Sequence, residues 1–311
     1  MENTTTKKGF IPVMLTPFKD NGAIDFDGLT HLTELYLEAG ASGLFANCLS
    51  SEMFELTEKE RLQTIEHIIK ITNGTAPVVA TGTFEGSIET QADFIKKVHN
   101  TGTQAVILLA GLIAKESDSD AVFNDNVFRL LDKTENIPVG FYECPVPYKR
   151  LLSPEQLRLF VDTGRVIYHK DTCLNLDTIK QKLAVTADAP TFGLYDAYMA
   201  HAVDTLKAGS AGLSCIQGNY FPELIVWLCD NYNNDDLQEE VTNVQHFLIK
   251  NMDVMHHVYP TVSKYFLQKR GFEISTFTRR EVGTFTPNIA KQIEQLYASY
   301  TQLQNTLELV S

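Results

Sequence analysis

Short apolar runs alternate with longer segments of helical periodicity from the N-terminus to about residue 215. Because strands buried on both faces carry continuous runs of Val, Ile, Leu and Phe, each run predicts a strand of a parallel sheet. The eight predicted strands are Phe10–Leu15, Gly43–Asn47, Pro77–Gly82, Ala105–Leu109, Pro138–Tyr142, Val166–Lys170, Thr191–Leu194 and Gly212–Cys215. Helices are predicted between them at Phe26–Glu38, Thr57–Ile71, Ser87–Asn100, Asp120–Lys133, Pro154–Val161, Leu176–Leu183 and Ala197–Leu206.

Polar residues and glycines mark the ends of these helices. Asp25, Thr57, Ser87 and Ser153 stand where a side-chain oxygen would accept from the free N–H groups of a first helical turn. Glycines such as Gly40 follow the helices as stop signals. Eight strand-then-helix units predict the α/β class and a (β/α)8 TIM barrel.

An open, doubly wound sheet is the competing architecture. Such a sheet usually has a glycine-rich phosphate-binding turn after its first strand. Here that turn reads Leu15-Thr16-Pro17-Phe18, and the chain contains no GxGxxG or GxxxxGK motif. The sequence therefore favours the barrel.

From Phe221 onward the pattern is helical only. The predicted helices are Pro222–Asn231, Leu237–His257, Pro260–Lys269 and Ile289–Leu309. This is more helix than one closing barrel helix requires, and no linker rich in Pro, Gly or Ser separates it from the barrel. We predict a barrel domain at residues 1–220 and a C-terminal helical extension at residues 221–311 that packs on it.

Composition and charge narrow the function classes. The 311 residues contain 26 Lys and Arg against 39 Asp and Glu, a net charge of −13, which argues against nucleic-acid and anionic-membrane partners. The longest apolar stretch, Ala105–Ala114, is shorter than the ~20 residues of a membrane span and predicts a buried strand. The polar N-terminus lacks the apolar core of a signal peptide, so we predict a cytoplasmic location.

Cysteine and histidine spacing gives no sign of a metal site or disulfide framework. The five cysteines are odd in number and scattered, and neither CxxC nor HExxH occurs. We therefore expect reduced thiols, no metal and no cofactor.

Reactive side chains follow the ends of the predicted strands, where a barrel places its active site. In the sixth strand, Tyr168 and Lys170 share one face by alternation. If Lys170 points into the barrel, burial would favour its neutral amine, which is the form that Schiff-base chemistry needs. From the residues alone Lys170 could equally reach solvent or pair with Asp171, so both interpretations stay open.

Two further strand ends carry candidate groups. Tyr142 ends the fifth strand on the face of Gly140, whose small size would leave room for a ligand. After the second strand, Ser50 and Ser51 offer two hydroxyls and two backbone amides that could bind a carboxylate. Rim tyrosines and serine pairs are also common as ordinary packing and loop residues.

Taken together, several motifs resemble the dihydrodipicolinate synthase/N-acetylneuraminate lyase family, whose members are class I pyruvate-dependent aldolases. The motifs are Gly9-Phe10-Ile11-Pro12-Val13-Met14-Leu15-Thr16-Pro17-Phe18, Ser50-Ser51-Glu52 with Leu56-Thr57-x-x-Glu60-Arg61, Tyr142-x-x-Pro145, Lys170-Asp171, and Gly212-Leu213-Ser214 with Asn219. Their order and spacing match from about Gly9 to Ile225.

The resemblance implies a role for three residues. Lys170 falls on the family's Schiff-base lysine, Tyr142 on the tyrosine that shuttles protons, and Ser50, with the Ser50 and Ser51 amides, on the group that grips the substrate carboxylate. It also implies a small-molecule 2-oxo acid as substrate and a homo-oligomer, a tetramer or dimer. Gly193, Ser214, Lys149 and Arg150 are the further substrate-binding candidates, the last two as cations for a distal anionic group.

Three parts of the family's lysine-pathway apparatus are missing or moved. Leu49 replaces a loop hydroxyl, Leu108-Leu109-Ala110-Gly111-Leu112-Ile113 lacks the relay tyrosine, and no arginine closely follows Tyr142. We therefore predict a Schiff-base-forming lyase or aldolase that cleaves or condenses a 2-oxo acid, such as a sugar-derived one, with pyruvate as product or substrate. The alternatives are 4-hydroxy-tetrahydrodipicolinate synthase, from pyruvate and aspartate semialdehyde, and a non-catalytic barrel that binds 2-oxo acids.

Overall fold

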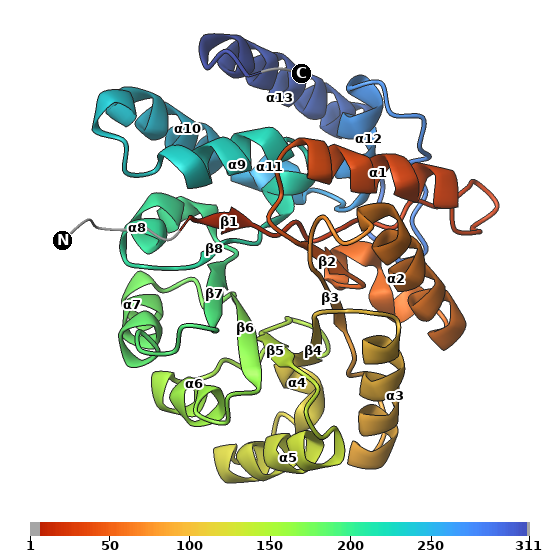
Figure 1. Cartoon of the computed structure of the whole chain (residues 1–311). Coiled ribbons are helices and arrows are strands. Elements are labelled where there is room, and N and C mark those ends of the chain that lie inside the picture. The colour runs from red at the N-terminus through yellow and green to blue at the C-terminus, as the bar shows by residue number, and fades with distance from the viewer. Residues whose placement is uncertain (1–6, 310–311) are drawn as a thin grey trace.

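A parallel sheet of eight strands forms the centre of the molecule in the computed structural model, which describes residues 7–309 (Figure 1). The strands are β1 (Gly9–Phe10), β2 (Leu44–Ala46), β3 (Val78–Thr81), β4 (Ala105–Leu109), β5 (Val139–Tyr142), β6 (Val166–Asp171), β7 (Gly193–Asp196) and β8 (Gly212–Leu213). From β2 to β8 each strand pairs with the next one along the chain, and β1 pairs with β8. The predicted strands are therefore all present.

The sheet closes on itself between the segment after β1 and β2. Val13 lies opposite Phe45, whose N–H donates to the carbonyl of Pro12 at 3.0 Å and whose carbonyl accepts from Met14 at 3.1 Å. Because Pro12 has no N–H, regular pairing stops early, and the predicted strand Phe10–Leu15 shrinks to two residues and a bridge. The closed sheet confirms the TIM barrel.

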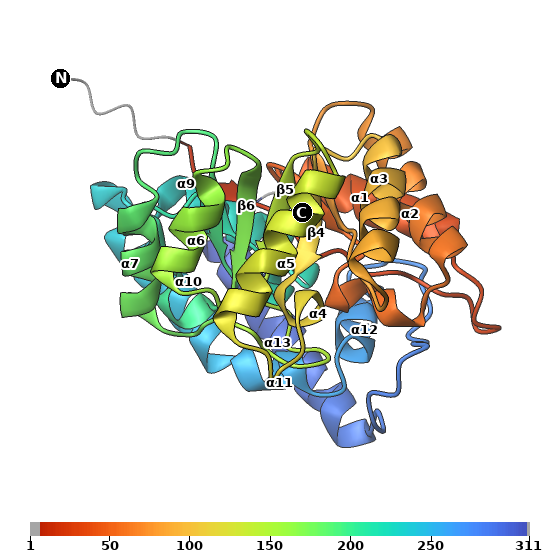
Figure 2. The same cartoon turned by 90° about the horizontal axis from the view of Figure 1, so that it is seen from below.

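Helices surround this barrel on its outer face (Figures 1 and 2). They are α1 (Phe26–Glu38), α2 (Glu58–Thr72), α3 (Ile88–Asn100), the short α4 (Ala110–Ile113), α5 (Asp120–Lys133), α6 (Pro154–Val161), α7 (Leu176–Val185) and α8 (Ala202–Lys207). The predicted capping residues Asp25, Thr57, Ser87 and Ser153 all accept a hydrogen bond from a backbone N–H of the first helical turn. Local capping chemistry thus fixes where these helices begin.

The apolar run Ala105–Ala114 is not one buried strand, as the sequence predicted. It is β4 followed directly by α4, and Leu109 is the residue where the backbone turns. Both parts are mostly buried, so their hydrophobicity is the same and does not distinguish them. Gly111 lies in this turn, where an added Cβ would stand 2.3 Å from the carbonyl oxygen of Tyr148.

The C-terminal region is a helical extension packed on the barrel, as predicted. It contains α9 (Pro222–Asn231), α10 (Gln238–Lys250), α11 (Met252–His256), α12 (Thr261–Lys269) and α13 (Pro287–Thr306), which gather on one side in Figure 1. One hydrophobic cluster joins Phe10 and Leu213 of the barrel to Phe221, Phe266 and Tyr300. The predicted single helix Leu237–His257 is broken at Asn251. A division near residue 220 stays our proposal.

Inside the barrel, aromatic side chains pack together toward the C-terminal ends of β5 and β6. Phe45 packs edge-to-face on Tyr142 and Tyr168, with ring centroids 5.8 and 6.0 Å apart. This packing holds the ends of β5 and β6 in place. No helix within residues 7–309 is long and apolar enough to cross a membrane.

Candidate active site

A cavity of about 330 Å³ lies at the C-terminal ends of the strands. Its lining combines barrel residues with residues of the C-terminal extension: Leu49, Ser50, Tyr142, Pro145, Lys149, Lys170, Thr172, Leu174, Ala197, Tyr198, Cys215, Ile216, Gln217, Met252, His256, Tyr259 and Arg280. A larger cavity of about 640 Å³ is lined by residues at the N-terminal ends of the strands. The smaller cavity is the candidate site, because it contains Lys170 and Tyr142 and lies at the end where barrel enzymes carry their chemistry.

Lys170, on β6, is a buried lysine without a counter-ion. Its Nζ lies 4.1 Å from the centre of the Tyr142 ring and, within residues 7–309, forms neither a hydrogen bond nor an ion pair. Burial therefore lowers the pKa of Lys170. The other two buried lysines are paired: Lys182 contacts two carboxylates and Lys264 contacts Glu52. The open question of Lys170 is answered in favour of the inward-facing side chain.

Tyr142 lies beside Lys170 across the β5–β6 pairing. Burial raises the pKa of the Tyr142 phenol well above its ordinary value, so the hydroxyl is protonated in the cavity. The sequence suggested that Gly140 leaves room for a ligand, and this prediction is wrong. An added Cβ there would lie 2.8 Å from the Cβ of Tyr168, so Gly140 accommodates that side chain.

A chain of hydrogen bonds ends at Ser50. Tyr36 donates to Asn219 Oδ1 at 2.6 Å, Asn219 Nδ2 donates to the hydroxyl of Tyr259 at 2.6 Å, and Tyr259 donates to Ser50 Oγ at 2.8 Å. In each of these three bonds the donor stands one step further from Ser50 than the acceptor. Since Ser50 already accepts from Tyr259, its own hydrogen is left to donate to a ligand acceptor, which suits a carboxylate.

The neighbouring residues of this loop have structural contacts. The Ser51 hydroxyl donates to the carbonyl of Met14 at 2.6 Å, and its N–H donates to the carbonyl of Cys48. Glu52 is fully buried and accepts from Lys264 Nζ at 3.0 Å and from the N–H groups of Arg279 and Arg280 at 2.7 and 2.9 Å. Glu52 thus fastens the C-terminal extension to the Ser50 loop.

The structure brings only some of the predicted site residues together. Lys170, Tyr142, Ser50 and Lys149 line the cavity, and Ser51, Gly193, Ser214 and Arg150 do not. Gly193 lies in the cavity at the other end of the barrel. The Ser214 hydroxyl donates to the Ile11 carbonyl and accepts from Tyr168, and Arg150 pairs with Asp120 and donates to the carbonyls of Lys115 and Asp118.

The sequence predicts that Gln217, after the eighth strand, forms part of the cavity wall, and the structure places it there. Gln217 belongs to the short helical turn Ile216–Asn219 after β8. Tyr259 and Arg280 are cavity residues that the sequence did not reveal. Tyr259 and Arg280 come from the extension, about 90 and 110 positions after Lys170 in the chain. No local pattern marks either of them, because only the packing of the extension brings them to the cavity.

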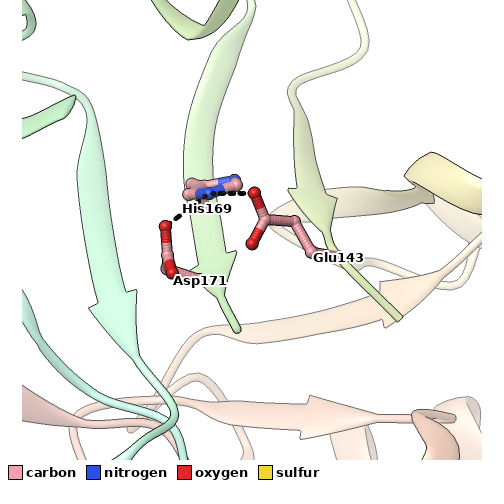
Figure 3. Close-up of side chains that lie close together, drawn as sticks. All are labelled: Glu143, His169 and Asp171. Carbon is pink, nitrogen blue, oxygen red and sulfur yellow. Dashed lines mark ion pairs between the residues drawn. The ribbon is translucent and has the colours of Figure 1, made fainter. Parts of the chain in front are cut away.

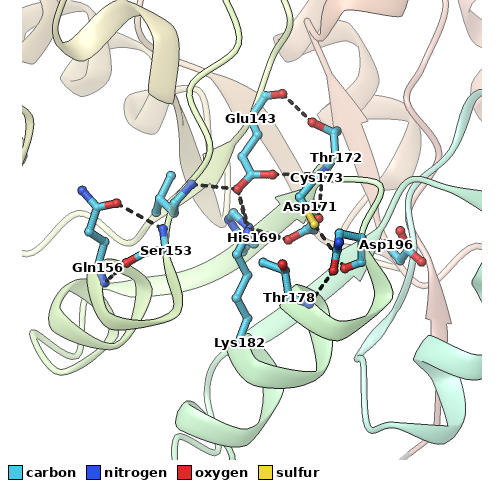
Figure 4. Close-up of polar contacts among 12 residues, drawn as sticks. Glu143, Ser153, Gln156, His169, Asp171, Thr172, Cys173, Thr178, Lys182 and Asp196 are labelled. Carbon is cyan, nitrogen blue, oxygen red and sulfur yellow. Dashed lines mark hydrogen bonds and ion pairs between the residues drawn. The ribbon is translucent and has the colours of Figure 1, made fainter. Parts of the chain in front are cut away.

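A buried ion network lies behind β5 and β6, with Glu143, His169, Asp171 and Lys182 all fully buried (Figures 3 and 4). Lys182 Nζ lies 2.7 Å from Glu143 Oε1 and 2.6 Å from Asp171 Oδ2. Although burial acts against the charge of Lys182, the two carboxylates outweigh it and raise its pKa. Figure 3 shows His169 between the carboxylates, at 3.5 and 3.4 Å.

Among the described residues, Glu143, His169 and Asp171 are the one group close enough to hold a metal ion. The Lys182 ammonium already occupies the position of the cation between both carboxylates. Glu143 also accepts from the N–H group of Leu152 and from that of Thr172, which Figure 4 labels. The group is therefore a structural ion network that fixes the segments flanking Tyr142 and Lys170.

Cys144 and Cys215 act on Lys170 as neighbouring groups, and both are protonated thiols. Burial raises the pKa of Cys144 to about 11 and of Cys215 to about 12. A thiol in this state is a poor metal ligand and a poor nucleophile.

These features define a class of protein. A closed parallel barrel whose cavity holds a buried, unpaired lysine beside a protonated phenol is the arrangement of a barrel enzyme of the class I aldolase type. A model of the dihydrodipicolinate synthetase family matches residues 6–299. The chain belongs to this family, which confirms the resemblance found in the sequence.

Individual relatives point to more than one reaction. The chain is 25% identical over 264 residues to the 4-hydroxy-tetrahydrodipicolinate synthase of Bacillus subtilis, covering 85% of this chain and 89% of the relative. It is 21% identical over 272 residues to the probable 2-dehydro-3-deoxy-D-pentonate aldolase YjhH of Escherichia coli, covering 86% and 89%. The crystal structure of YagE from E. coli K12, in complex with pyruvate, superposes with a TM-score of 0.84 at 20% identity and covers 96% of this chain and 98% of YagE.

Proposed function

We propose that the protein is a Schiff-base-forming lyase or aldolase that cleaves or condenses a 2-oxo acid, with pyruvate as product or substrate. The observation that carries the proposal is Lys170, the buried lysine that has no carboxylate partner among the described residues. A paired ammonium such as that of Lys182 is held in its charged form. The unpaired Lys170 loses its proton more readily, and the neutral amine is the nucleophile.

The cavity residues divide the reaction between them. Ser50 donates to the carboxylate of the 2-oxo acid, which directs C2 toward Lys170. The amine adds to C2, and Tyr142 supplies the proton with which the carbinolamine oxygen leaves as water. In the cleavage direction the C4 hydroxyl gives its proton to the Tyr142 phenolate that the previous step left. The C3–C4 bond then breaks, and its electron pair moves into the imine. An aldehyde leaves, the enamine takes a proton at C3, and water releases pyruvate and the free amine.

Borohydride trapping tests this role. Reduction in the presence of pyruvate should add a stable adduct to the peptide that contains Lys170. The Lys170→Ala variant should lose it, and Lys182 serves as an internal control because its ammonium is paired on both sides. A wild-type protein without an adduct, under conditions that trap a known lyase, would remove the proposal. Pyruvate binding unaffected by Lys170→Ala would favour a non-catalytic binding barrel.

A second candidate is 4-hydroxy-tetrahydrodipicolinate synthase, and the curated relative of that name supports it. The predicted departures from that pathway's apparatus, at Leu49 and in the turn after β4, count against it. Condensation of pyruvate with aspartate semialdehyde, compared with cleavage of 2-oxo-3-deoxy sugar acids, separates the two. Efficient synthase turnover would reverse our ranking.

We also propose a cytoplasmic location and a homo-oligomer, a dimer or tetramer, without nucleic-acid partners. The net charge of −13 supports the absence of nucleic-acid partners, and the family resemblance supports the homo-oligomer. Light scattering coupled to size-exclusion chromatography measures the assembly directly.

A further inference from the structure

The cavity wall is positively charged although the protein is acidic. The whole chain carries a net charge of −13. Of the cavity-lining residues, Lys149, Lys170 and Arg280 are basic, and in the part of the chain that the structure describes no Asp or Glu lines it. With Lys170 assigned to the imine, two cations remain for another part of the substrate.

Arg280 is held in position by its backbone and leaves most of its side-chain donors free. Its N–H donates to Glu52 Oε2 at 2.9 Å, and one guanidinium nitrogen donates to the carbonyl of Tyr259 at 2.9 Å. Within residues 7–309 it forms no ion pair, whereas the adjacent Arg279 pairs with Glu60 at 2.6 Å. A guanidinium has five N–H donors in a planar fork that fits a carboxylate or phosphate.

The Lys149 ammonium is the second cation of the cavity wall. Its ammonium donates to the carbonyl of Thr172, and it forms no ion pair among the described residues. Lys149 lies on the segment after β5, whereas Arg280 belongs to the C-terminal extension. The two cations therefore reach one cavity from two independent parts of the fold.

Gln217 provides a separate sign that the cavity takes a polar ligand. Gln217 is one of the lining residues and is only 2% exposed, and its Oε1 has no hydrogen-bond partner in the described part of the chain. A buried amide without a partner is unfavourable, so such a group points to a ligand that completes it. A substrate hydroxyl has the matching chemistry.

We propose that the substrate is a dianionic, hydroxylated 2-oxo acid, and that Arg280 and Lys149 bind its distal anionic group. Cleavage then yields pyruvate and an aldehyde that carries its own carboxylate or phosphate. The proposal rests on the function proposed above, since it assigns the second half of the same cavity.

Pairs of non-cleavable 2-oxo acids test it without requiring turnover. 2-Oxopentanoate and 2-oxoglutarate have the same chain length and differ in the distal carboxylate, as do 2-oxohexanoate and 2-oxoadipate. The readout is the concentration that half-saturates the borohydride adduct at Lys170. For at least one pair we expect the dianion to saturate about ten-fold lower, equivalent to about 1.4 kcal/mol.

Variants assign that preference to the cations. In Arg280→Gln the preference should fall to about two-fold or less, with Arg280→Lys in between, and in Lys149→Gln it should fall in part. Lys207→Gln removes the same charge from an exposed position outside the cavity and should keep the full preference. Condensation with glyceraldehyde 3-phosphate against glyoxylate, each compared with glyceraldehyde, distinguishes a phosphate from a carboxylate.

Two failures are distinguishable. Absence of any adduct with all four acids refutes the proposed function itself. Adducts that form with equal half-saturation for neutral-tailed and dianionic acids, or a preference that Arg280→Gln leaves unchanged, refute only the anion subsite.

Discussion

The hydroxyl of Tyr259 gives a sharp test of how the carboxylate grip is built. Tyr259→Phe removes a single oxygen and keeps the ring. In the structure this oxygen accepts from Asn219 and donates to Ser50. Without it the Ser50 hydroxyl is free to rotate, and the donor chain no longer ends at the ligand.

The expected loss of pyruvate affinity follows from these contacts. Free rotation among three staggered wells costs about 0.6 kcal/mol, since RT is about 0.6 kcal/mol and ln 3 is about 1. A hydrogen bond to a charged group contributes about 1.5–3 kcal/mol, and loss of polarisation by the chain removes about 10–30% of it. The sum is about 1 kcal/mol, which predicts about five-fold weaker binding of pyruvate.

The assay is the pyruvate concentration that half-saturates the borohydride adduct, with thermal unfolding as a check on folding. Tyr36→Phe is the matched control, because Tyr36 lies two hydrogen bonds further from Ser50 and should cause a smaller change in the same direction. The reasoning is refuted if folded Tyr259→Phe binds pyruvate as tightly as the wild type, or if Tyr36→Phe has the larger effect.

Three further predictions concern charge and packing. Lys182→Met removes the ammonium between two buried carboxylates and should lower the free energy of unfolding by about 3–5 kcal/mol in chemical denaturation. Because the Asp171 pKa is lowered and the Lys182 pKa is raised, this difference should shrink below pH 3.8 and above pH 10.5, and a pH-independent difference would contradict the pairing. Since the Lys170 pKa is lowered, the rate of imine trapping should reach its plateau below pH 10.5, and a midpoint at or above that value would contradict a buried unpaired amine. Gly212→Ala would place the new Cβ 1.7 Å from the Gly9 carbonyl oxygen, so it should lower the free energy of unfolding by at least about 3 kcal/mol. Gly164→Ala is the control: its new Cβ would meet no heavy atom within 4 Å, but the φ of +69° strains an alanine, so it should cost about 1 kcal/mol.

The sequence was most informative where chemistry is local. Continuous apolar runs and capping residues predict the barrel, because each depends on neighbours a few positions away. The alternation of β6 placed Lys170 and Tyr168 on one face, and both are buried in the structure. The predicted strand Thr191–Leu194 was displaced by two residues from β7, and Gly193 therefore begins the strand at the far end from the cavity.

What the sequence could not supply depends on tertiary placement. Arg150 looks like a free cation in the sequence, but Asp120, thirty positions earlier, pairs with it at 2.9 Å. Ser51 looks equivalent to Ser50 in the sequence, but in the folded structure its hydroxyl donates to the carbonyl of Met14. Tyr259 and Arg280 carry no motif, and their role follows only from the contacts of Glu52 and Ser50 with the extension.

The link between Ser50 and Tyr259 also bears on how the protein is made. The two residues are 209 positions apart, so at about 5–20 residues per second a ribosome needs about 10–40 s to add the second after the first. Lys170 and Tyr142 are synthesised within that interval, before Tyr259 exists to orient the Ser50 hydroxyl. We expect the nascent chain to carry its reactive amine well before it can hold a substrate carboxylate firmly, so competence for catalysis arrives late in translation.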